Sequence, residues 1–164
     1  MIHFSWTRLL LHVFNGKKKV ILWVRNGLVE VNMKKQIKVV AAVIENENKE
    51  ILCALRSSTM TMPNMWEFPG GKVEEDEDLP MAIKREIQEE LGCVVEPEEL
   101  HNEHIHEYET FNIQLITIKC RLEDGTPMPS EHAKLLWLRR EHLSSLVWAP
   151  ADIPAVELLR KERT

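Results

Sequence analysis

The stretch that most constrains this chain runs from Gly71 to Cys93 and reads GKVEEDEDLPMAIKREIQEELGC. Its second half predicts a helix, because apolar residues recur every four positions and form one stripe. These residues are Ile83, Ile87 and Leu91. Asp78 is a suitable N-cap, Pro80 falls in the first turn, and Gly92 is placed to end the helix in a left-handed conformation. We therefore expect one amphipathic helix that begins and ends within this stretch.

One face of the predicted helix is strongly acidic. Glu86, Glu89 and Glu90 lie at i, i+3 and i+4, so their carboxylates share that face. Like charges at this spacing repel, and a helix that served only as scaffold would have no reason to collect them. Hard divalent cations such as Mg²⁺ bind several oxygen ligands, which such a face supplies. The alternative interpretation is a solvated acidic surface.

The whole segment shows a longer spacing pattern. It reads Gly71-x5-Glu77-x7-Arg85-Glu86-Ile87-x-Glu89-Glu90-x-Gly92-Cys93. This pattern resembles the signature of the Nudix hydrolase family almost position for position. Cys93 stands where the family usually has an aliphatic residue, and a free cysteine behaves as a small hydrophobe. The resemblance covers about residues 37–160 and implies an α/β fold, the α/β/α Nudix sandwich with a mixed β-sheet between helices.

Length and composition limit the classes of protein. A chain of 164 residues, 44% hydrophobic and 29% charged, suits one globular domain with its own core. The net charge of −5 argues against a general binder of nucleic acid polymers. The chain has no run that would cross a membrane, and its three dispersed cysteines suit reduced thiols. We expect a cytoplasmic protein without nucleic acid or membrane partners, as a monomer or dimer.

Residues 1–32 differ from the rest, with five basic side chains and one acidic. Asn26-Gly27 favours a type I′ turn, and therefore a hairpin over 20–31. Another interpretation is that these residues are not native. Val29 to Met33 can be back-translated as GTG-GAG-GTG-AAT-ATG, which contains the bacterial ribosome-binding sequence GGAGGTGA. We therefore expect an atypical extension over 1–32, translation from Met33 and a Nudix domain over 33–164. The N-terminal peptide from the native host tests this, and peptides from residues 1–32 would contradict it.

The remaining pattern predicts the order β–β–β–α–β–β–β–α. Strands are expected at 38–45, 50–56, 66–71, 94–95, 101–108, 111–122 and 134–138, with a charged turn at 96–99 and helices at 140–146 and 151–161. The loop 57–64 is rich in methionine, which suits either a flexible base pocket or residues that hold the loop on the core. His104 and His106 alternate on one strand, a pattern more typical of a solvated face than of a zinc site.

The family resemblance implies a metal site. Glu89 and Glu90 are expected to be ligands of Mg²⁺, with Mn²⁺ possible in its place. Glu86 is expected to be either a further ligand or the base that receives a proton from water. The backbone carbonyl of Gly70 is expected as another ligand. Clustered oxygen donors of this kind suit the hydrolysis of phosphoanhydrides, because the reaction needs neutralised charge and an oriented water.

Three more residues belong to this predicted site. Arg85 is expected to pair with Glu77 and to hold the loop and helix in register, although a surface ion pair of little energetic value is the alternative. Glu131 falls where a later loop carboxylate of MutT-type enzymes joins the metal site. Its alternative interpretation is an ordinary loop charge.

Within the family, the chain looks most like MutT-type enzymes, which cut nucleoside triphosphates to the monophosphate and pyrophosphate. WEFPGGKVE, Arg56 and WAPADIPAVE carry that resemblance. Arg56 is expected to meet the phosphate or sugar of the nucleotide. Asp152 stands where MutT has a base-reading Asn, and an ionised carboxylate there would favour bases with N–H donors. The alternative is that Asp152 caps the last helix.

The sequence allows three functions: two enzymes that differ in substrate, and a protein that only binds nucleotides. Some relatives remove oxidised nucleotides such as 8-oxo-dGTP, whereas others prefer CTP and modified deoxycytidine triphosphates. A non-catalytic nucleotide-binding Nudix-like module usually lacks the catalytic glutamates. Because the glutamates of the signature and Arg85 are intact here, the sequence favours an enzyme.

Overall fold

The computed structural model describes residues 9–14, 17–24, 27–32 and 34–162. The chain forms two compact units, Met1–Lys35 and Gln36–Thr164. In the first unit, β1 (Leu9–Phe14), β2 (Lys17–Val24) and β3 (Gly27–Asn32) form an antiparallel sheet in that order. The hairpin expected over 20–31 is therefore present as β2 and β3, and Gly27 pairs with Val24. Asn26 lies outside the described residues, so the turn type stays a prediction.

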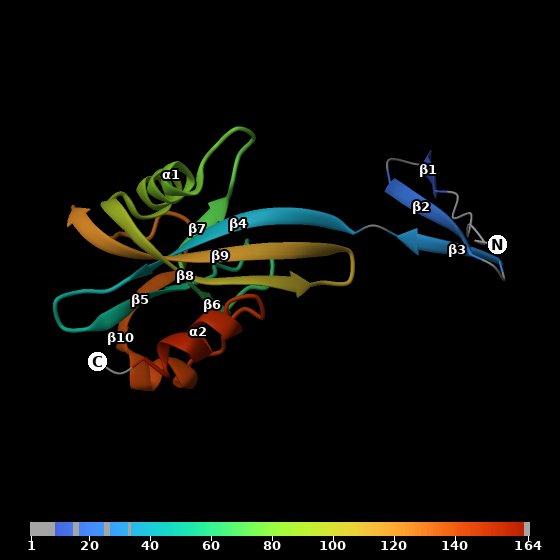
Figure 1. Cartoon of the computed structure of the whole chain (residues 1–164). Helices are drawn as coiled ribbons and strands as arrows, with labels where there is room; N and C mark the ends of the chain where they lie inside the picture. The colour runs from blue at the N-terminus through green and yellow to red at the C-terminus, as the bar shows by residue number, and fades with distance from the viewer. Residues whose placement is uncertain (1–8, 15–16, 25–26, 33, 163–164) are drawn as a thin grey trace, which may run out of the picture. The chain divides into compact units, whose positions relative to one another are not determined.

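The second unit holds two small sheets and their helices (Figure 1). One sheet has the order β7-β4-β9-β8 and the other β10-β5-β6. The elements are β4 (Lys35–Ile44), β5 (Glu50–Leu55), β6 (Trp66–Glu67), β7 (Gly70–Lys72), α1 (Leu79–Leu91), β8 (Val94–Glu107), β9 (Phe111–Asp124), β10 (Lys134–Arg139), the 3₁₀ helix η1 (Arg140–Ser145) and α2 (Ile153–Leu159). β4 and β9 run in the same direction, whereas β7 and β8 pair antiparallel with them, so the sheet is mixed.

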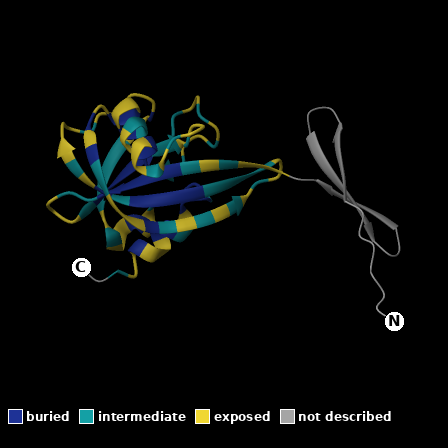
Figure 2. Ribbon diagram, turned by 45° about the horizontal axis from the view of Figure 1, so that its top comes forward, coloured by how far each residue is buried: buried dark blue, intermediate teal, exposed yellow. Residues whose placement is uncertain are grey.

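β4 separates two hydrophobic layers. Its residues alternate between them, as the period of a strand requires. Val40, Ala42 and Ile44 join the α1 side, and Ala41 and Val43 join the α2 side. Figure 2 shows the buried positions concentrated in these central strands and the exposed ones at the outside. The fold is an α/β sandwich, and α1 and α2 cover opposite faces of the mixed sheet.

The ends of α1 are set by local chemistry, as the sequence predicted. A side-chain oxygen of Asp78 accepts a hydrogen bond from the backbone N–H of Met81 at 2.8 Å. Gly92 ends the helix with φ +65°, and its N–H donates to the carbonyl of Gln88. The apolar stripe of Ile83, Ile87 and Leu91 is buried. With its stripe packed on the sheet, α1 leaves Glu89 exposed on its acidic face, whereas Glu90 of the same face is buried.

One predicted turn is wrong. Residues 96–99 do not leave the sheet, and β8 is a single strand of 14 residues. The pairing of β8 with β9 shifts register at three places, one of them beside Pro97. Bulges of this kind accommodate a proline that has no N–H to donate to the sheet. The last helix is also shorter than the expected 151–161. Within the described residues, every helix is too short or too polar to cross a bilayer.

Candidate active site

A cleft of about 940 Å³ in the second unit brings most of the predicted site together. Seven predicted residues line it: Arg56, Gly70, Arg85, Glu86, Glu89, Glu131 and Asp152. Glu90 is buried and accepts a hydrogen bond from the backbone of Gly70. Glu77 accepts a hydrogen bond from Arg85, which lines the cleft. The acidic face of α1 therefore shares one cleft with residues more than sixty positions away along the chain.

The turn between β6 and α1 approaches the acidic face closely because it contains two glycines. A Cβ on Gly71 would lie 2.3 Å from the carboxylate carbon of Glu86. A Cβ on Gly70 would lie 2.2 Å from the carbonyl oxygen of Val40, and its φ of +150° disfavours other residues. The N–H of Gly70 donates to Oε2 of Glu90 at 3.1 Å. Glycine at these positions lets backbone and carboxylates meet.

Arg85 holds the loop before α1 against the helix. Its Nε and Nη2 donate to the two carboxylate oxygens of Glu77 at 2.9 and 2.8 Å, and Nη2 also donates to the carbonyl of Lys72 at 3.0 Å. The hydrogen bonds from Arg85 lower the pKa of Glu77 to about 2. Nη1 contacts Glu86 at 2.9 Å and Glu89 at 3.3 Å. This bidentate, partly buried pair is stronger than an exposed ion pair.

The donor set fits a hard divalent cation, although across residues 34–162 no group of three His, Cys, Asp or Glu side chains is arranged to hold a metal ion. The guanidinium of Arg85 instead lies against Glu86 and Glu89. Burial raises the pKa of Glu90 to about 7, helped by the nearby charges of Glu67 and Glu86. A bound cation would favour the ionised form of this buried carboxylate. Carboxylate and carbonyl oxygens are the ligands that Mg²⁺ and Mn²⁺ prefer.

Asp152 also lines the cleft and is buried. Its Oδ1 accepts a hydrogen bond from the N–H of Phe68 at 3.1 Å. Among the described residues it makes no side-chain capping bond to α2, so the helix-cap alternative is wrong. Burial raises the pKa of Asp152 to about 8. The raised pKa favours the neutral acid, which both donates and accepts, over the ionised side chain that the sequence led us to expect.

Two methionines of the predicted loop 57–64 and one tyrosine that the sequence did not single out line the same cleft as Asp152. Met60 and Met62 line the cleft, which favours the base-pocket interpretation of their loop. Tyr108 also lines it, and its ring lies 4.6 Å from that of His106 and 5.0 Å from that of Phe111. The alternation of His106 and Tyr108 was visible in the sequence. What it did not show is that this face of β8 leads into the cleft.

Arg56 belongs to a partly buried chain of polar side chains whose other members, Glu67 and His132, the sequence did not indicate. Arg56 donates from Nη1 to Glu67, and His132 Nε2 lies 2.9 Å from the other oxygen of Glu67. Burial lowers the pKa of His132, but the hydrogen bond to Glu67 and the charge of Glu90 outweigh it and raise that pKa. Arg56 also donates from Nε and Nη2 to the carbonyl and hydroxyl of Thr61 at 2.6 and 2.8 Å.

Comparison with known proteins agrees with this geometry. A family profile described as the NUDIX domain matches residues 40–158. The chain belongs to the Nudix family. It is 40% identical to the CTP pyrophosphohydrolase of Escherichia coli K12 over 123 residues, which are 75% of this chain and 90% of that protein. It is 30% identical to the 8-oxo-dGTP diphosphatase of the same organism over 127 residues, or 77% and 98% of the two chains.

A solved structure shows the same fold. The solution NMR structure of MutT, a Nudix hydrolase from methicillin-resistant Staphylococcus aureus 252, is 45% identical with a TM-score of 0.67. The match covers 80% of this chain and all of that one. The Nudix fold and family that the 71–93 segment predicted are thus confirmed, and the chain is a Nudix hydrolase.

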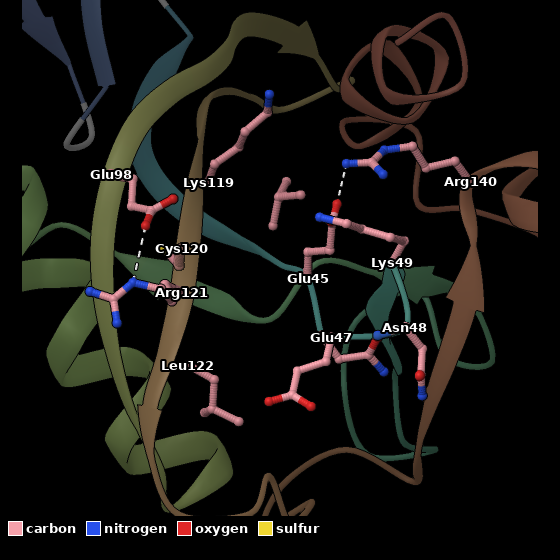
Figure 3. A pocket seen from close by; sticks show the side chains of 12 residues that line it. Glu45, Glu47, Asn48, Lys49, Glu98, Lys119, Cys120, Arg121, Leu122 and Arg140 are labelled. Carbon is pink, nitrogen blue, oxygen red and sulfur yellow. Dashed lines mark hydrogen bonds and ion pairs between the residues drawn. The ribbon is translucent and has the colours of Figure 1, made fainter. Parts of the chain in front are cut away.

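A second cleft of about 800 Å³ lies at the other end of the Nudix sheet (Figure 3). It is formed by the turn 45–49, the end of β9 and Arg140. Its charged groups pair with one another, as Arg140 does with Glu45 and Arg121 with Glu98. Within residues 34–162, no residue of the 71–93 signature lines this second cleft. The residues of the signature therefore line the cleft beside α1 and not this one.

Proposed function

We propose that this Nudix hydrolase is a divalent-metal-dependent nucleoside triphosphate pyrophosphohydrolase that releases the monophosphate and pyrophosphate. The observation that carries this proposal is that one cleft joins the acidic face of α1 to a buried residue suited to read a base, Asp152. Two relatives have names that describe reactions of this class. We also propose that residues 33–164 carry the activity, and that the enzyme acts on free cytoplasmic nucleotides, which its net charge favours.

The proposed metal ligands are the carbonyl of Gly70 and the carboxylates of Glu86, Glu89, Glu90 and Glu131. Mg²⁺ or Mn²⁺ at this position would screen the phosphate charges and acidify a water molecule. Glu86 lines the cleft, where it is suited to bind the metal or to accept the proton of that water. Arg85 and Glu77 keep the helix and the glycine turn in register around the phosphates.

Arg56 is proposed to contact the phosphate or sugar of the nucleotide. An arginine has five N–H donors. Three of them donate to Glu67 and Thr61 within the described residues, and Arg56 lines the cleft. In this role Arg56 would link the substrate to the walls of the cleft.

The proposed substrate is an oxidised nucleotide such as 8-oxo-dGTP, with CTP or a modified dCTP as the second candidate. An 8-oxoguanine edge presents adjacent N–H donors, which suit the ionised form of Asp152. A cytosine edge presents one donor and one acceptor, which suit its neutral form. The 40% identity to a protein named CTP pyrophosphohydrolase favours the second candidate. Because the pKa of Asp152 is about 8, both forms are accessible near neutral pH.

A nucleotide screen tests the proposal. The purified protein is incubated with 8-oxo-dGTP, dCTP, CTP, dUTP and dTTP, with and without Mg²⁺, and the products are resolved by ion-exchange chromatography. We expect metal-dependent release of monophosphate and pyrophosphate, with 8-oxo-dGTP or a cytidine nucleotide ahead of dUTP and dTTP. Asp152→Ala should narrow that gap and leave the Mg²⁺ requirement unchanged. Release of orthophosphate, or no hydrolysis of any of these nucleotides, would reject the proposal.

A further inference from the structure

Glu131 lies in a short segment that is fixed on both sides. Before it, the hydroxyl of Ser130 lies 2.7 Å from the carbonyl oxygen of Glu90 and 3.0 Å from that of Glu89. The N–H of Ser130 also donates to the carbonyl of Glu90 at 3.0 Å. These contacts hold the segment at the C-terminal end of α1, next to the proposed metal ligands. Ordinary loop charges have no such framework around them.

After Glu131, the chain turns inward. The side chain of His132 is 1% exposed and its Nε2 contacts Oε1 of Glu67 at 2.9 Å. The next residue is fixed as well, since the N–H of Ala133 donates to the carbonyl of Leu55 at 2.8 Å. Glu131 itself is exposed and lines the cleft. Its backbone is therefore held by a buried histidine while its carboxylate faces the cleft.

The histidine connects Glu131 to the other wall of the cleft. Glu67 binds His132 with one oxygen and Arg56 with the other, and Arg56 binds Thr61 twice. The loop that contains Thr61, residues 57–64, also carries Met60 and Met62, which line the cleft. We call this loop the base-side loop, because it is proposed to contact the base. A continuous polar chain thus runs from the base-side loop to the residue beside Glu131. Each buried member depends on its neighbours, because an unpaired buried polar group is costly.

We propose that His132 is a positioning residue for Glu131, and that through Glu67 and Arg56 it ties the placement of this carboxylate to the base-side loop. This inference rests on the proposed function, in which Glu131 is a metal ligand. His132 does not itself face the substrate. Its hydrogen bond to Glu67 fixes the backbone from which Glu131 reaches the metal.

Binding of Mn²⁺ to the whole protein, followed by electron paramagnetic resonance of the free ion, tests the inference without relying on turnover. Glu131→Gln should weaken Mn²⁺ binding. His132→Leu should weaken it by about 10-fold, the lower range for loss of a group that orients a metal ligand. The double variant should bind no more weakly than Glu131→Gln alone, since both changes remove the same contribution. His132→Gln keeps an N–H near Glu67 and should retain most of the affinity.

A matched control separates positioning from general stability. His101 is also buried, with a side chain 1% exposed, and its Nε2 lies 3.0 Å from the carbonyl of Ala155. His101→Leu should lower the melting temperature but leave Mn²⁺ binding unchanged. If His132→Leu does not fold, Glu67→Gln replaces it, because the amide keeps the shape while weakening the bond to His132. We expect the same loss of affinity and the same non-additivity with Glu131→Gln.

The outcomes are distinguishable. Full Mn²⁺ affinity in both His132→Leu and Glu67→Gln, together with weakened binding in Glu131→Gln, would overturn the inference and leave the proposed function standing. Additive losses in the double variant would also overturn it, because His132 would then act independently of Glu131. If Glu131→Gln binds Mn²⁺ normally, the ligand role of Glu131 and the inference both fail. The nucleotide screen then decides separately whether the proposed hydrolysis takes place.

Discussion

Asp152 and Phe68 are 84 positions apart in sequence, yet Oδ1 of Asp152 accepts the backbone N–H of Phe68 at 3.1 Å. This bond joins the residue before α2 to the short segment between β6 and β7, which leads to Gly70 and Gly71. The bond therefore fixes the position of Asp152, the proposed base-reading residue, relative to the proposed metal ligands. The carboxyl group is buried, and burial raises its pKa to about 8.

The raised pKa of Asp152 predicts a pH-dependent stability. The folded pKa of about 8 lies above the ordinary value of 3.8, so the folded state holds a proton that the unfolded state has released. This contribution to the free energy of unfolding is complete below pH 3.8 and is lost as the pH rises through 8. Asp152→Asn cannot titrate. Urea unfolding at pH 5, 7 and 9 should show the wild type losing stability relative to the variant, and a constant difference would contradict the prediction.

The same ionisation predicts a change in base preference. Above pH 8 the ionised carboxylate only accepts hydrogen bonds and suits the adjacent N–H donors of 8-oxoguanine, whereas the neutral acid also suits cytosine. The ratio of kcat/KM for 8-oxo-dGTP over dCTP should therefore rise between pH 6.5 and 8.5. Asp152→Asn provides the control, because any change that remains in it comes from the bases themselves. Parallel profiles in the two proteins would show that Asp152 does not read the base.

Glu86→Gln should lower turnover by at least about 10²-fold, because the amide keeps the shape but cannot accept a proton or carry the charge that binds metal. The melting temperature should change little. Glu47→Gln is the matched control, since it removes the same charge from the second cleft. Steady-state kinetics with saturating Mg²⁺ make the comparison. Equal turnover in the two variants would refute the role of Glu86.

Arg85→Lys should also reduce turnover, by about 10²-fold. Lysine keeps the charge but cannot bind both oxygens of Glu77 and the carbonyl of Lys72 at once. The glycine turn would shift against α1, and a displacement of about 1 Å can cost that factor. Arg121→Lys serves as the control, because Arg121 is 59% exposed and pairs with Glu98 at the surface. Similar activity in both variants would mean that the Arg85–Glu77 pair is only a surface ion pair.

How well the sequence predicts each structural feature depends on how far apart the interacting residues are along the chain. Helix α1 could be predicted from end to end, because Asp78 caps a residue three positions away and Gly92 ends the helix by its own backbone conformation. The strand β8 was divided wrongly, because Pro97 and the three glutamates around it resemble a turn. Only the pairing with β9 shows that bulges keep this segment in the sheet.

The site divides in the same way. Glu86 and Arg85 were predicted because the signature is continuous in sequence and α1 is a regular helix. The pairing of Glu67 with His132 spans 65 positions, and no local pattern indicates it. The raised pKa of Asp152 was also inaccessible from the sequence, since it depends on burial in the folded chain. Sequence spacing thus predicts the residues proposed to bind the metal, whereas the surroundings of Asp152 are set by tertiary packing.

The position of bond cleavage can be predicted from the proposed class. If the enzyme is of MutT type, water attacks the β-phosphorus of the nucleoside triphosphate, and its oxygen leaves in pyrophosphate. A reaction in ¹⁸O-water, followed by mass spectrometry of both products, should place the label in pyrophosphate. Label in the monophosphate would indicate attack at the α-phosphorus instead.

Substitutions at two glycines of the 71–93 segment, Gly71 and Gly92, should have opposite effects on turnover and stability. In Gly71→Ala the new Cβ would lie 2.3 Å from the carboxylate carbon of Glu86. That carboxylate is the far end of a flexible side chain, so it moves aside at small cost to stability. The shift displaces the carboxylate of Glu86, which lines the cleft, by about 1 Å. This displacement should lower turnover by roughly 10²-fold.

Gly92→Ala should instead lower the stability and leave turnover unchanged. Gly92 has φ +65°, and among the described residues no atom lies within 4 Å of an added Cβ. The cost is therefore conformational, about 1–2 kcal/mol for an alanine in the left-handed region. This loss weakens the end of α1 while leaving the acidic face in place, so urea unfolding should detect it and turnover should not. If Gly71→Ala instead loses stability and keeps its turnover, the close approach of Gly71 to Glu86 serves the fold and not the reaction.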